Sequence, residues 1–347
     1  MSMFDNIEKT NLSEMGEFGL IDHLTKSVKL TQKSSIKGIG DDAAVLDFSS
    51  KKTLISTDLL LENVHFDLRY VPLKHLGYKA IQVNLSDIYA MNGMASQVTI
   101  SIGLSSKFPL EAIEEIYEGA LIACDKYNVD LIGGDTSTST QGLIISVTSI
   151  GYAEADDIAY RSGAKEGDLI CVSGDLGGAY VGLQLLEREK QIYLENPAIQ
   201  PDLEGKDYII ERQLKPEARR DVVELLEALK VKPHAMIDVS DGLASEILHI
   251  CHDSKVGCKL YEDKIPIDPM TYETAREFGL DPTVCALSGG EDYELLFTVP
   301  QSDFDKVKNQ LDITIIGHIT EEAAGCYLVS KSGNVHELKA QGWNAFN

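Results

Sequence analysis

The chain has 347 residues, and at about 150 residues per domain this length predicts two domains. Its 31 lysines and arginines against 55 aspartates and glutamates give a net charge of −24 at pH 7. So acidic a surface repels phosphate backbones and anionic lipid headgroups, which argues against nucleic acids and membranes as partners.

In chain order, apolar runs bounded by glycine and turn signals predict buried strands, and apolar residues at helical spacing predict helices. The predicted strands are 53–58, 97–104, 143–153, 168–174, 294–299 and 313–319. The predicted helices are 74–92 and 109–127, the second with Pro109 in its first turn. This pattern indicates a mixed α/β fold.

A polar, charged stretch over 153–165 predicts the domain boundary. It gives an N-terminal domain of residues 1–153 and a C-terminal domain of residues 154–347. The segment 187–216 is charged and carries three prolines, so we predict an exposed excursion with few core residues.

The first 21 residues show no basic patch followed by an apolar core, and no segment approaches the ~20 apolar residues of a membrane span. The cysteines are scattered without a CxxC pair. We therefore expect a cytoplasmic protein with buried, reduced thiols and no zinc site. The six cysteines are Cys124, Cys171, Cys251, Cys258, Cys285 and Cys326.

Six segments place acidic residues beside glycine or small polar residues, where a strand ends or a helix begins. Each is weak evidence alone, because acidity also keeps a protein soluble. Together they suggest several hard cations, such as Mg²⁺, that neutralise a nucleoside triphosphate. The segments are 38–46, 56–66, 84–93, 132–137, 238–242 and 288–297.

Asp87 falls on an apolar helical face, where an unpartnered carboxylate is costly. Asp87 therefore needs either a metal ion or a basic partner, and the sequence allows both. Ser56, Thr57 and Asp58 end a strand with three oxygen-bearing side chains in a row, which Mg²⁺ accepts together with waters. Asp42 follows two glycines, and a solvated turn is the alternative to a metal ligand there.

Two glycines precede Asp135, and the second, Gly134, lets the backbone approach a phosphate or an ion closely. Asp238, Ser240 and Asp241 precede an apolar helix. Capping of that helix explains one of these three residues but not all of them.

Arg161 is the best-placed basic residue to contact a phosphate, and an interdomain ion pair is the alternative. His65 sits within a polar cluster, although a lone histidine is usually structural. Glu291 follows two glycines. No P-loop, dinucleotide fingerprint or protein-kinase signature is present.

Eight segments taken together resemble the thiamine-monophosphate kinases, from about residue 16 to the C-terminus. They are GEFGLI, GIGDDAAVL, STDLLLENVHF, GYKAIQVNLSDIYAMNG, LIGGDTS, RSGAKEGD, DVSDGL and SGGEDYELLFTV. The resemblance implies the two-domain fold of aminoimidazole ribonucleotide synthetase, with an N-terminal sheet that pairs across a homodimer. It also implies that ATP and thiamine monophosphate give ADP and thiamine diphosphate, the last step of thiamine diphosphate biosynthesis, with several Mg²⁺ ions.

The resemblance also implies roles for particular residues. The family's metal ligands fall on Asp42, Ser56, Thr57, Asp58, Asp87, Asp135, Asp238 and Asp241. Its ATP contacts fall on Tyr117, Gly134, Asp135, Arg161 and Ser240. Its thiamine-phosphate contacts fall on His65, Glu291 and Trp343, and a packed C-terminal anchor is the alternative role for Trp343.

A phosphate-monoester acceptor has a second pKa of ~6 and is mostly dianionic at pH 7, so we expect no general base. We expect direct in-line transfer without a phosphoenzyme. Two alternatives remain. One is another ATP-using enzyme of the same fold; selenophosphate synthetases, however, usually depend on a reactive cysteine near the N-terminus, and the first cysteine here is Cys124. The other is a non-catalytic cation- or nucleotide-binding regulator.

Overall fold

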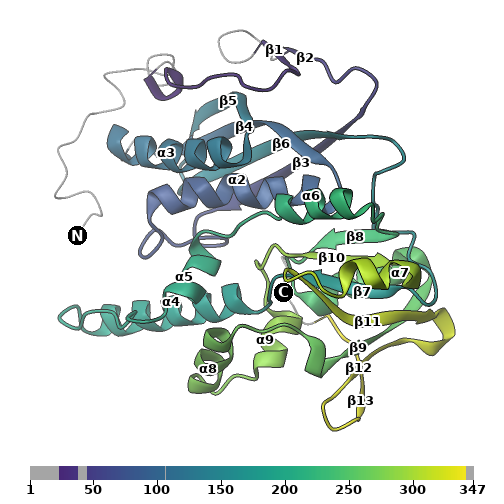
Figure 1. The fold of residues 1–347 in the computed structure, drawn as a ribbon. Helices are drawn as coiled ribbons and strands as arrows, with labels where there is room; N and C mark the ends of the chain where they lie inside the picture. The colour runs from purple at the N-terminus through teal and green to yellow at the C-terminus, as the bar shows by residue number, and fades with distance from the viewer. Residues whose placement is uncertain (1–22, 38–44, 106, 341–347) are drawn as a thin grey trace. The chain divides into compact units, whose positions relative to one another are not determined.

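The computed structural model describes residues 23–37, 45–105 and 107–340. The chain divides into two compact units, each with its own sheet (Figure 1). The N-terminal unit runs to Ile88 and resumes over Gly93–Ala155, and the C-terminal unit takes Tyr89–Asn92 and the chain from Asp156 onward. None of the helices in the described ranges combines the length and apolar character needed to cross a membrane.

The sheet of the N-terminal unit has four strands in the order β3-β6-β4-β5. β4 and β5 are parallel, and the other neighbours are antiparallel. The strands are β3 Lys52–Leu61, β4 Met94–Leu104, β5 Asp130–Thr138 and β6 Ile144–Ala153, and a separate pair is formed by β1 Ser35–Lys37 and β2 Val45–Leu46. Burial along β3 alternates from residue to residue, so one face of the sheet is covered and the other is open.

Helices α2 (Leu73–Ala90) and α3 (Leu110–Tyr127) lie side by side over the covered face (Figure 1). Two glycines set how closely they approach. A Cβ on Gly77 would lie 1.8 Å from the Ile116 carbonyl oxygen, and a Cβ on Gly119 would lie 1.8 Å from that of Lys74. The two backbones are therefore in contact, and α2 is held in a fixed position over the sheet.

The sheet of the C-terminal unit has seven strands in the order β13-β12-β9-β11-β7-β10-β8. Only the β12–β9 pair is parallel among these described strands. Every residue of β10, the last strand but one, is buried, so both faces of the sheet are covered there. The strands are β7 Leu169–Ser173, β8 Ala235–Asp238, β9 Val256–Tyr261, β10 Leu295–Val299, β11 Ile313–Glu321, β12 Cys326–Val329 and β13 Val335–Glu337.

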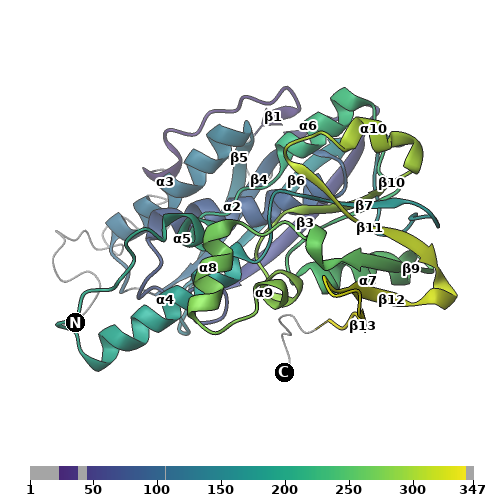
Figure 2. The ribbon, with the colours of Figure 1, turned by 60° about the horizontal axis from the view of Figure 1, so that its bottom comes forward.

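Seven helices accompany this sheet in the described chain, and α4, α5, α8 and α9 pack together around a small core of their own (Figure 2). The helices are α4 Gly178–Glu195, α5 Asp207–Leu214, α6 Arg220–Leu229, α7 Leu243–Ser254, α8 Pro269–Glu277, α9 Pro282–Ser288 and α10 Phe304–Val307.

The mixed α/β fold predicted from the sequence is confirmed, and each predicted strand and helix overlaps an observed one. The segment 187–216 contains more buried structure than its charge suggested. Its first residues continue α4, and α5 buries Ile209 completely against Val181 and Leu185. Gly182 permits this contact, because a Cβ there would lie 2.0 Å from the Ile209 carbonyl oxygen.

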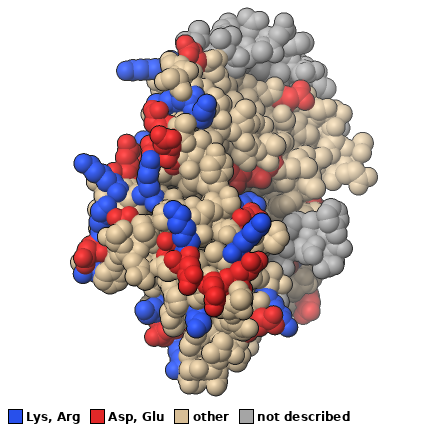
Figure 3. Space-filling model, turned by 90° about the vertical axis from the view of Figure 1, so that its right-hand side faces the viewer, with Lys and Arg blue, Asp and Glu red and all other residues tan. Residues whose placement is uncertain are grey.

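The acidic excess is dispersed rather than gathered into one block on the face shown in Figure 3, where acidic and basic side chains are interspersed. Several acids pair with neighbouring lysines or arginines, as Glu224 does with Arg220. The acidic excess by itself therefore does not locate a functional site.

Candidate functional site

In the N-terminal unit, Asp58 and Asp87 form a pair of carboxylates between β3 and α2. The Ser56 hydroxyl donates a hydrogen bond to Asp87, and the Asp58 backbone N–H donates to Asn84 Oδ1 at 2.9 Å. Asn84 is fully buried and also donates to the Ala80 carbonyl one turn back along α2. These bonds join the strand to the helix and keep the two carboxylates near each other.

The electrostatics of this pair favour a bound cation. Burial, and then the neighbouring charge of Asp87, raise the pKa of Asp58 to about 6. Two carboxylates and a hydroxyl are the hard oxygen donors that Mg²⁺ prefers, and a divalent ion would turn their repulsion into attraction. The donor set therefore fits Mg²⁺.

Thr57 does not join this group. Side chains alternate across a strand, so its hydroxyl lies on the opposite face of β3 from Ser56 and Asp58. There the Thr57 hydroxyl donates to the Val147 carbonyl at 3.0 Å and lies 3.1 Å from the Thr148 hydroxyl. The run of three oxygen-bearing residues in the sequence is thus divided between two faces of the sheet.

Gly134 and Asp135 lie on β5, at the other edge of the same sheet. The register places Asp58 and Gly134 in one row, with β6 and β4 between them, so their backbones are about 14 Å apart at ordinary strand spacing. A Cβ on Gly134 would lie 1.9 Å from the Ile100 carbonyl oxygen. Strand packing therefore already requires this glycine, whether or not a phosphate binds, and Asp135 beside it is exposed.

Two further predicted residues lie in this unit. Tyr117 is on the buried face of α3, and burial raises the pKa of its phenol to about 12. His65 is half-buried in the turn after β3, where its Nδ1 accepts the Leu61 N–H at 3.0 Å. This contact leaves Nε2 as the protonated nitrogen of the neutral ring. Asp42 and Trp343 lie outside the described residues.

In the C-terminal unit, the segments 238–241 and 290–294 run side by side. The Glu291 N–H donates to the Ser240 carbonyl at 2.7 Å, and the Tyr293 N–H donates to the Val239 carbonyl at 2.9 Å. Glu291 and Tyr293 both have positive φ, at 67° and 53°, a costly conformation for residues other than glycine. This pairing brings Glu291 into the same neighbourhood as Ser240.

Glu246 lies near Asp238 and Asp241, and the sequence motifs did not identify it. Glu246 Oε1 accepts the Asp241 backbone N–H at 3.0 Å. Burial, together with the charges of Asp238 and Asp241, raises the pKa of Glu246 to about 8. Burial also raises the pKa of Asp241, and the charge of Arg161 opposes that rise. The sequence signal that could have identified Glu246 is an acid in the first turn of an apolar helix, five residues after Asp241.

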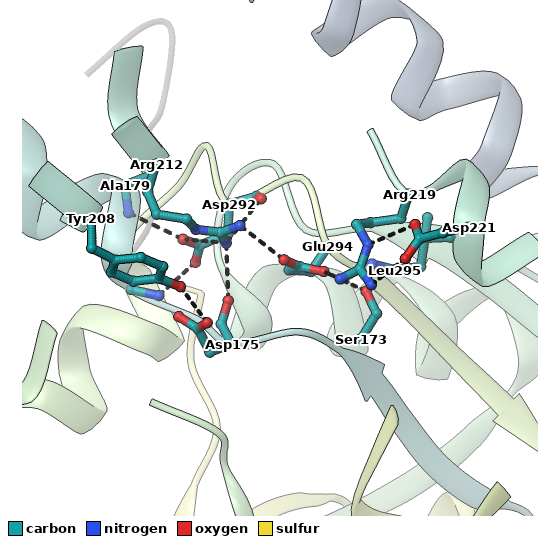
Figure 4. A network of polar contacts seen from close by, with 11 residues as sticks. Ser173, Asp175, Ala179, Tyr208, Arg212, Arg219, Asp221, Asp292, Glu294 and Leu295 are labelled. Carbon is teal, nitrogen blue, oxygen red and sulfur yellow. Dashed lines mark hydrogen bonds and ion pairs between the residues drawn. The ribbon is translucent and has the colours of Figure 1, made fainter. Parts of the chain in front are cut away.

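The other two acids of segment 288–297 have different partners (Figure 4). Glu294 is paired with Arg219 and, at 2.9 Å, with Arg212. Asp292 accepts the Gly177 N–H at 2.7 Å, and burial raises its pKa to about 7 although Arg212 opposes the rise. These buried acids hold the loop in place through their contacts with arginine side chains and backbone N–H groups.

Gln213, the residue after Arg212, contacts Glu291, which the sequence predicts to bind the substrate. Gln213 on α5 donates from Nε2 to Glu291 Oε2 at 2.7 Å. The network of Figure 4 fixes the backbone of the loop at Asp292, and the Gln213 contact beside it fixes the side chain of Glu291. Motif reading missed this network, because its members are about 80 residues apart in the sequence.

Comparisons with known proteins agree along nearly the whole chain. Residues 40–153 match the family model "AIR synthase related protein, N-terminal domain", and residues 165–327 match the corresponding C-terminal domain. The thiamine-monophosphate kinase of Aquifex aeolicus (strain VF5) is 36% identical, over 96% of this chain and 99% of its own. That of Bacillus subtilis (strain 168) is 35% identical, over 96% of this chain and 100% of its own.

Solved structures give the same picture. The structure of AaThiL complexed with AMPPCP and TMP has a TM-score of 0.74 at 35% identity, covering 98% of this chain and 100% of that one. A thiamine-monophosphate kinase from Stenotrophomonas maltophilia K279a has a TM-score of 0.78 at 32% identity, covering 94% of this chain and 98% of that one. The hydrogenase maturation protein HypE in complex with ATP, at 18% identity and a TM-score of 0.72, shares the fold.

The Asp58–Asp87 repulsion predicts a pH-dependent cost to the metal-free protein. The pKa of Asp58 is about 6 in the folded protein, above the ordinary 3.8. The contribution of protonated Asp58 to the free energy of unfolding is therefore fully present below pH 4 and is lost as the pH rises through 6. Asp58→Asn removes this dependence. With a chelator present, the variant should gain up to about 3 kcal/mol over the wild type between pH 4 and pH 7.

Urea unfolding at these two pH values measures the effect, and added Mg²⁺ should stabilise the wild type more than Asp58→Asn. Asp47→Asn, in an exposed turn, is the matched control and should follow the wild type in both respects. Equal pH dependence in the wild type and Asp58→Asn would contradict the assignment.

Proposed function

The chain belongs to the thiamine-monophosphate kinase family, and we propose that it transfers the γ-phosphoryl group of ATP to thiamine monophosphate, giving ADP and thiamine diphosphate. The observation that carries this proposal is the 36% identity to a thiamine-monophosphate kinase over 96% of the chain. A relative of known structure complexed with AMPPCP, an analogue of ATP, and TMP supports it. We place the reaction at the last step of thiamine diphosphate biosynthesis.

We assign Mg²⁺ binding to two groups of oxygen donors. The group in the N-terminal unit is Ser56, Asp58 and Asp87, to which we add Asp42 from the motif pattern. The Thr57 hydroxyl is left out because it lies on the other face of β3, and Asp135, in register with that other face at the far edge of the sheet, stays a separate proposal from the sequence. The group in the C-terminal unit is Asp238 and Asp241, with Glu246 beside them. What bound Mg²⁺ supplies is neutralisation of charge between the two phosphate groups.

For the nucleotide, Arg161 and Ser240 offer the polar contacts. Arg161 is exposed, and its charge opposes the raised pKa of Asp241, so it lies close enough to serve the same ligand. Gly134 contributes its backbone. Tyr117 is 8% exposed, and we assign it to the packing of α3 rather than to the nucleotide.

For the acceptor, His65 can donate from Nε2, because its Nδ1 already accepts a backbone N–H. Glu291 is held by Gln213 and carries the negative charge that suits the cationic thiazolium. Trp343 stays a proposal from the sequence alone. By this assignment residues 1–153 carry the first metal group and residues 154–347 carry Arg161, Ser240 and Glu291.

The chemistry requires positioning more than proton transfer. The acceptor phosphate is already mostly dianionic at pH 7, since its second pKa is ~6, so no general base is needed. The residues orient the two phosphates in line and reduce the repulsion between them. We therefore propose direct transfer without a phosphoenzyme.

We further propose a homodimer joined through the open face of the N-terminal sheet. On that face of β3, Ile55 is 68% and Leu59 is 50% exposed, and Ile55 is paired in register with half-buried Ile150 of β6. A row of exposed aliphatic side chains on a regular sheet is self-complementary under two-fold symmetry, which favours a second copy as its cover. We also propose a cytoplasmic location, since all six cysteines are free.

The activity is tested by turnover of thiamine monophosphate with ATP and Mg²⁺. We expect ADP and thiamine diphosphate in equal amounts. Asp87→Asn should lower kcat at least ~100-fold, since it removes charge stabilisation from the transition state. Glu118→Gln, in an exposed ion pair on α3, is the control and should keep full activity. Nucleotide binding without turnover would instead identify a regulator.

Direct transfer is tested with ATP that is chiral at the γ-phosphorus. A single in-line displacement inverts the configuration, so thiamine diphosphate should carry the inverted centre. Retention requires two successive displacements and would contradict transfer without a phosphoenzyme.

The dimer is tested by analytical ultracentrifugation. Leu59→Lys puts a charge in the centre of the proposed interface and should give monomers at concentrations where the wild type is dimeric. Leu311→Lys is the matched control, because Leu311 is fully exposed in the C-terminal unit. The proposal fails if both variants sediment as the wild type does, or if the wild type is monomeric.

A further inference from the structure

Three of the six cysteines, far apart in the sequence, come together in the C-terminal unit. Cys251 lies in the last turn of α7, Cys258 on β9 and Cys326 at the start of β12. Their sulfur atoms all lie within 4.8 Å of one another. The sequence-based expectation of scattered thiols is therefore wrong for these three. No other group of three histidine, cysteine or acidic ligands as close as this occurs among the described residues.

The fold holds this cysteine cluster in place through its backbone. Cys258 and Cys326 face each other in the parallel register of β9 and β12. The Cys258 N–H donates to the Gly325 carbonyl at 3.0 Å, and the Leu338 N–H donates to the Cys326 carbonyl at 3.0 Å. Lys255, in the left-handed conformation after α7, turns the chain so that β9 runs back along the helix that carries Cys251. The three sulfurs are thus pre-positioned by three separate elements.

The surroundings of the cluster are apolar, with one side toward solvent. Cys251 and Cys258 are 3% and 0% exposed, within the main hydrophobic core of the unit. Cys326 is half-buried and gives access from outside. Hydrogen bonds from the Cys251 and Cys258 thiols lower the pKa of Cys326 well below its ordinary value. Three thiols already gathered at this spacing are a starting arrangement from which a metal ion can displace the protons.

We propose that Cys251, Cys258 and Cys326 form a binding site for one thiophilic metal ion of filled d-shell, Zn²⁺ or Cu⁺. Thiolate sulfur selects these ions over Mg²⁺, so the site is chemically distinct from the carboxylate groups. Cu⁺ is satisfied by three sulfurs. Zn²⁺ prefers four ligands, and water would take the fourth position on the side of Cys326.

The charge balance is explicit for zinc. Zn²⁺ with three thiols gives a three-thiolate complex of net charge −1 and releases three protons. No electron is transferred and no disulfide forms. The half-buried position of Cys326 lets solvent stabilise the remaining charge, which a fully enclosed apolar site would not allow.

The test uses the full chain, reduced and metal-free under anaerobic conditions, with excess Mg²⁺ to occupy the carboxylate groups. Zn²⁺ is titrated against a chromophoric chelator, and Cu⁺ is titrated separately against a Cu⁺-specific chelator. We expect one ion per chain for at least one of the two metals, and the tighter one identifies the occupant. Substitution by Co²⁺ should give near-ultraviolet charge-transfer absorption from its thiolate ligands.

Cys326→Ser removes the most accessible ligand and should weaken binding by more than the ~10–100-fold that loss of a supporting residue costs. Cys285→Ser is the matched control, because Cys285 is a buried thiol on α9 outside the cluster. It should bind as the wild type does. Circular dichroism checks that both variants are folded.

A second measurement needs no variant. Bound metal should slow the alkylation of half-buried Cys326, which peptide mass spectrometry measures against the metal-free reduced protein. The proposal is overturned if neither ion binds to the reduced wild type at one per chain, if Cys326→Ser binds equally well, or if the metal leaves the alkylation of Cys326 unchanged. A Cys258–Cys326 disulfide formed in air, with no metal bound after reduction, would also overturn it.

Discussion

Repulsion between carboxylates that the fold forces together is the constraint on which the candidate site depends. Asp58 and Asp87 are brought close by hydrogen bonds that serve the packing of α2 on β3, through Ser56 and the buried Asn84. The cost appears in the raised pKa of Asp58. Burial and this repulsion together raise the free energy of the ionised pair in the metal-free protein, and a bound cation would lower it.

The C-terminal unit separates its acids into two kinds by their partners. Asp292 and Glu294 face the buried guanidinium groups of Arg212 and Arg219, and they hold a loop whose backbone includes two residues of positive φ. Asp238, Asp241 and Glu246 are close to one another, and burial, together with the charges of the two aspartates, raises the pKa of Glu246. The two kinds of acid differ in tertiary position and not in local sequence, because all five acids lie in similar acidic, glycine-containing stretches.

Sequence patterns predicted six of the strands and the two helices on the N-terminal sheet, because hydrophobic periodicity is a local property. They did not predict β8, whose four residues are too few for a pattern, or β5, whose glycines and exposed polar residues interrupt its apolar start. Motif reading grouped Thr57 with Ser56 and Asp58, whereas strand alternation separates it. Arg212 and Gln213 could not be found from the sequence, since a neighbourhood joined by tertiary contacts leaves no local signal.

Gly134 has a consequence for how this protein is dissected by mutation. Its Cβ would collide with the carbonyl of Ile100, so even alanine there disturbs the strand pairing on which the whole N-terminal sheet is built. Substitution of Gly134 would therefore mainly change the amount of folded protein. Substitution of Gly133 by alanine, where there is room for a methyl group, would instead report on ligand approach.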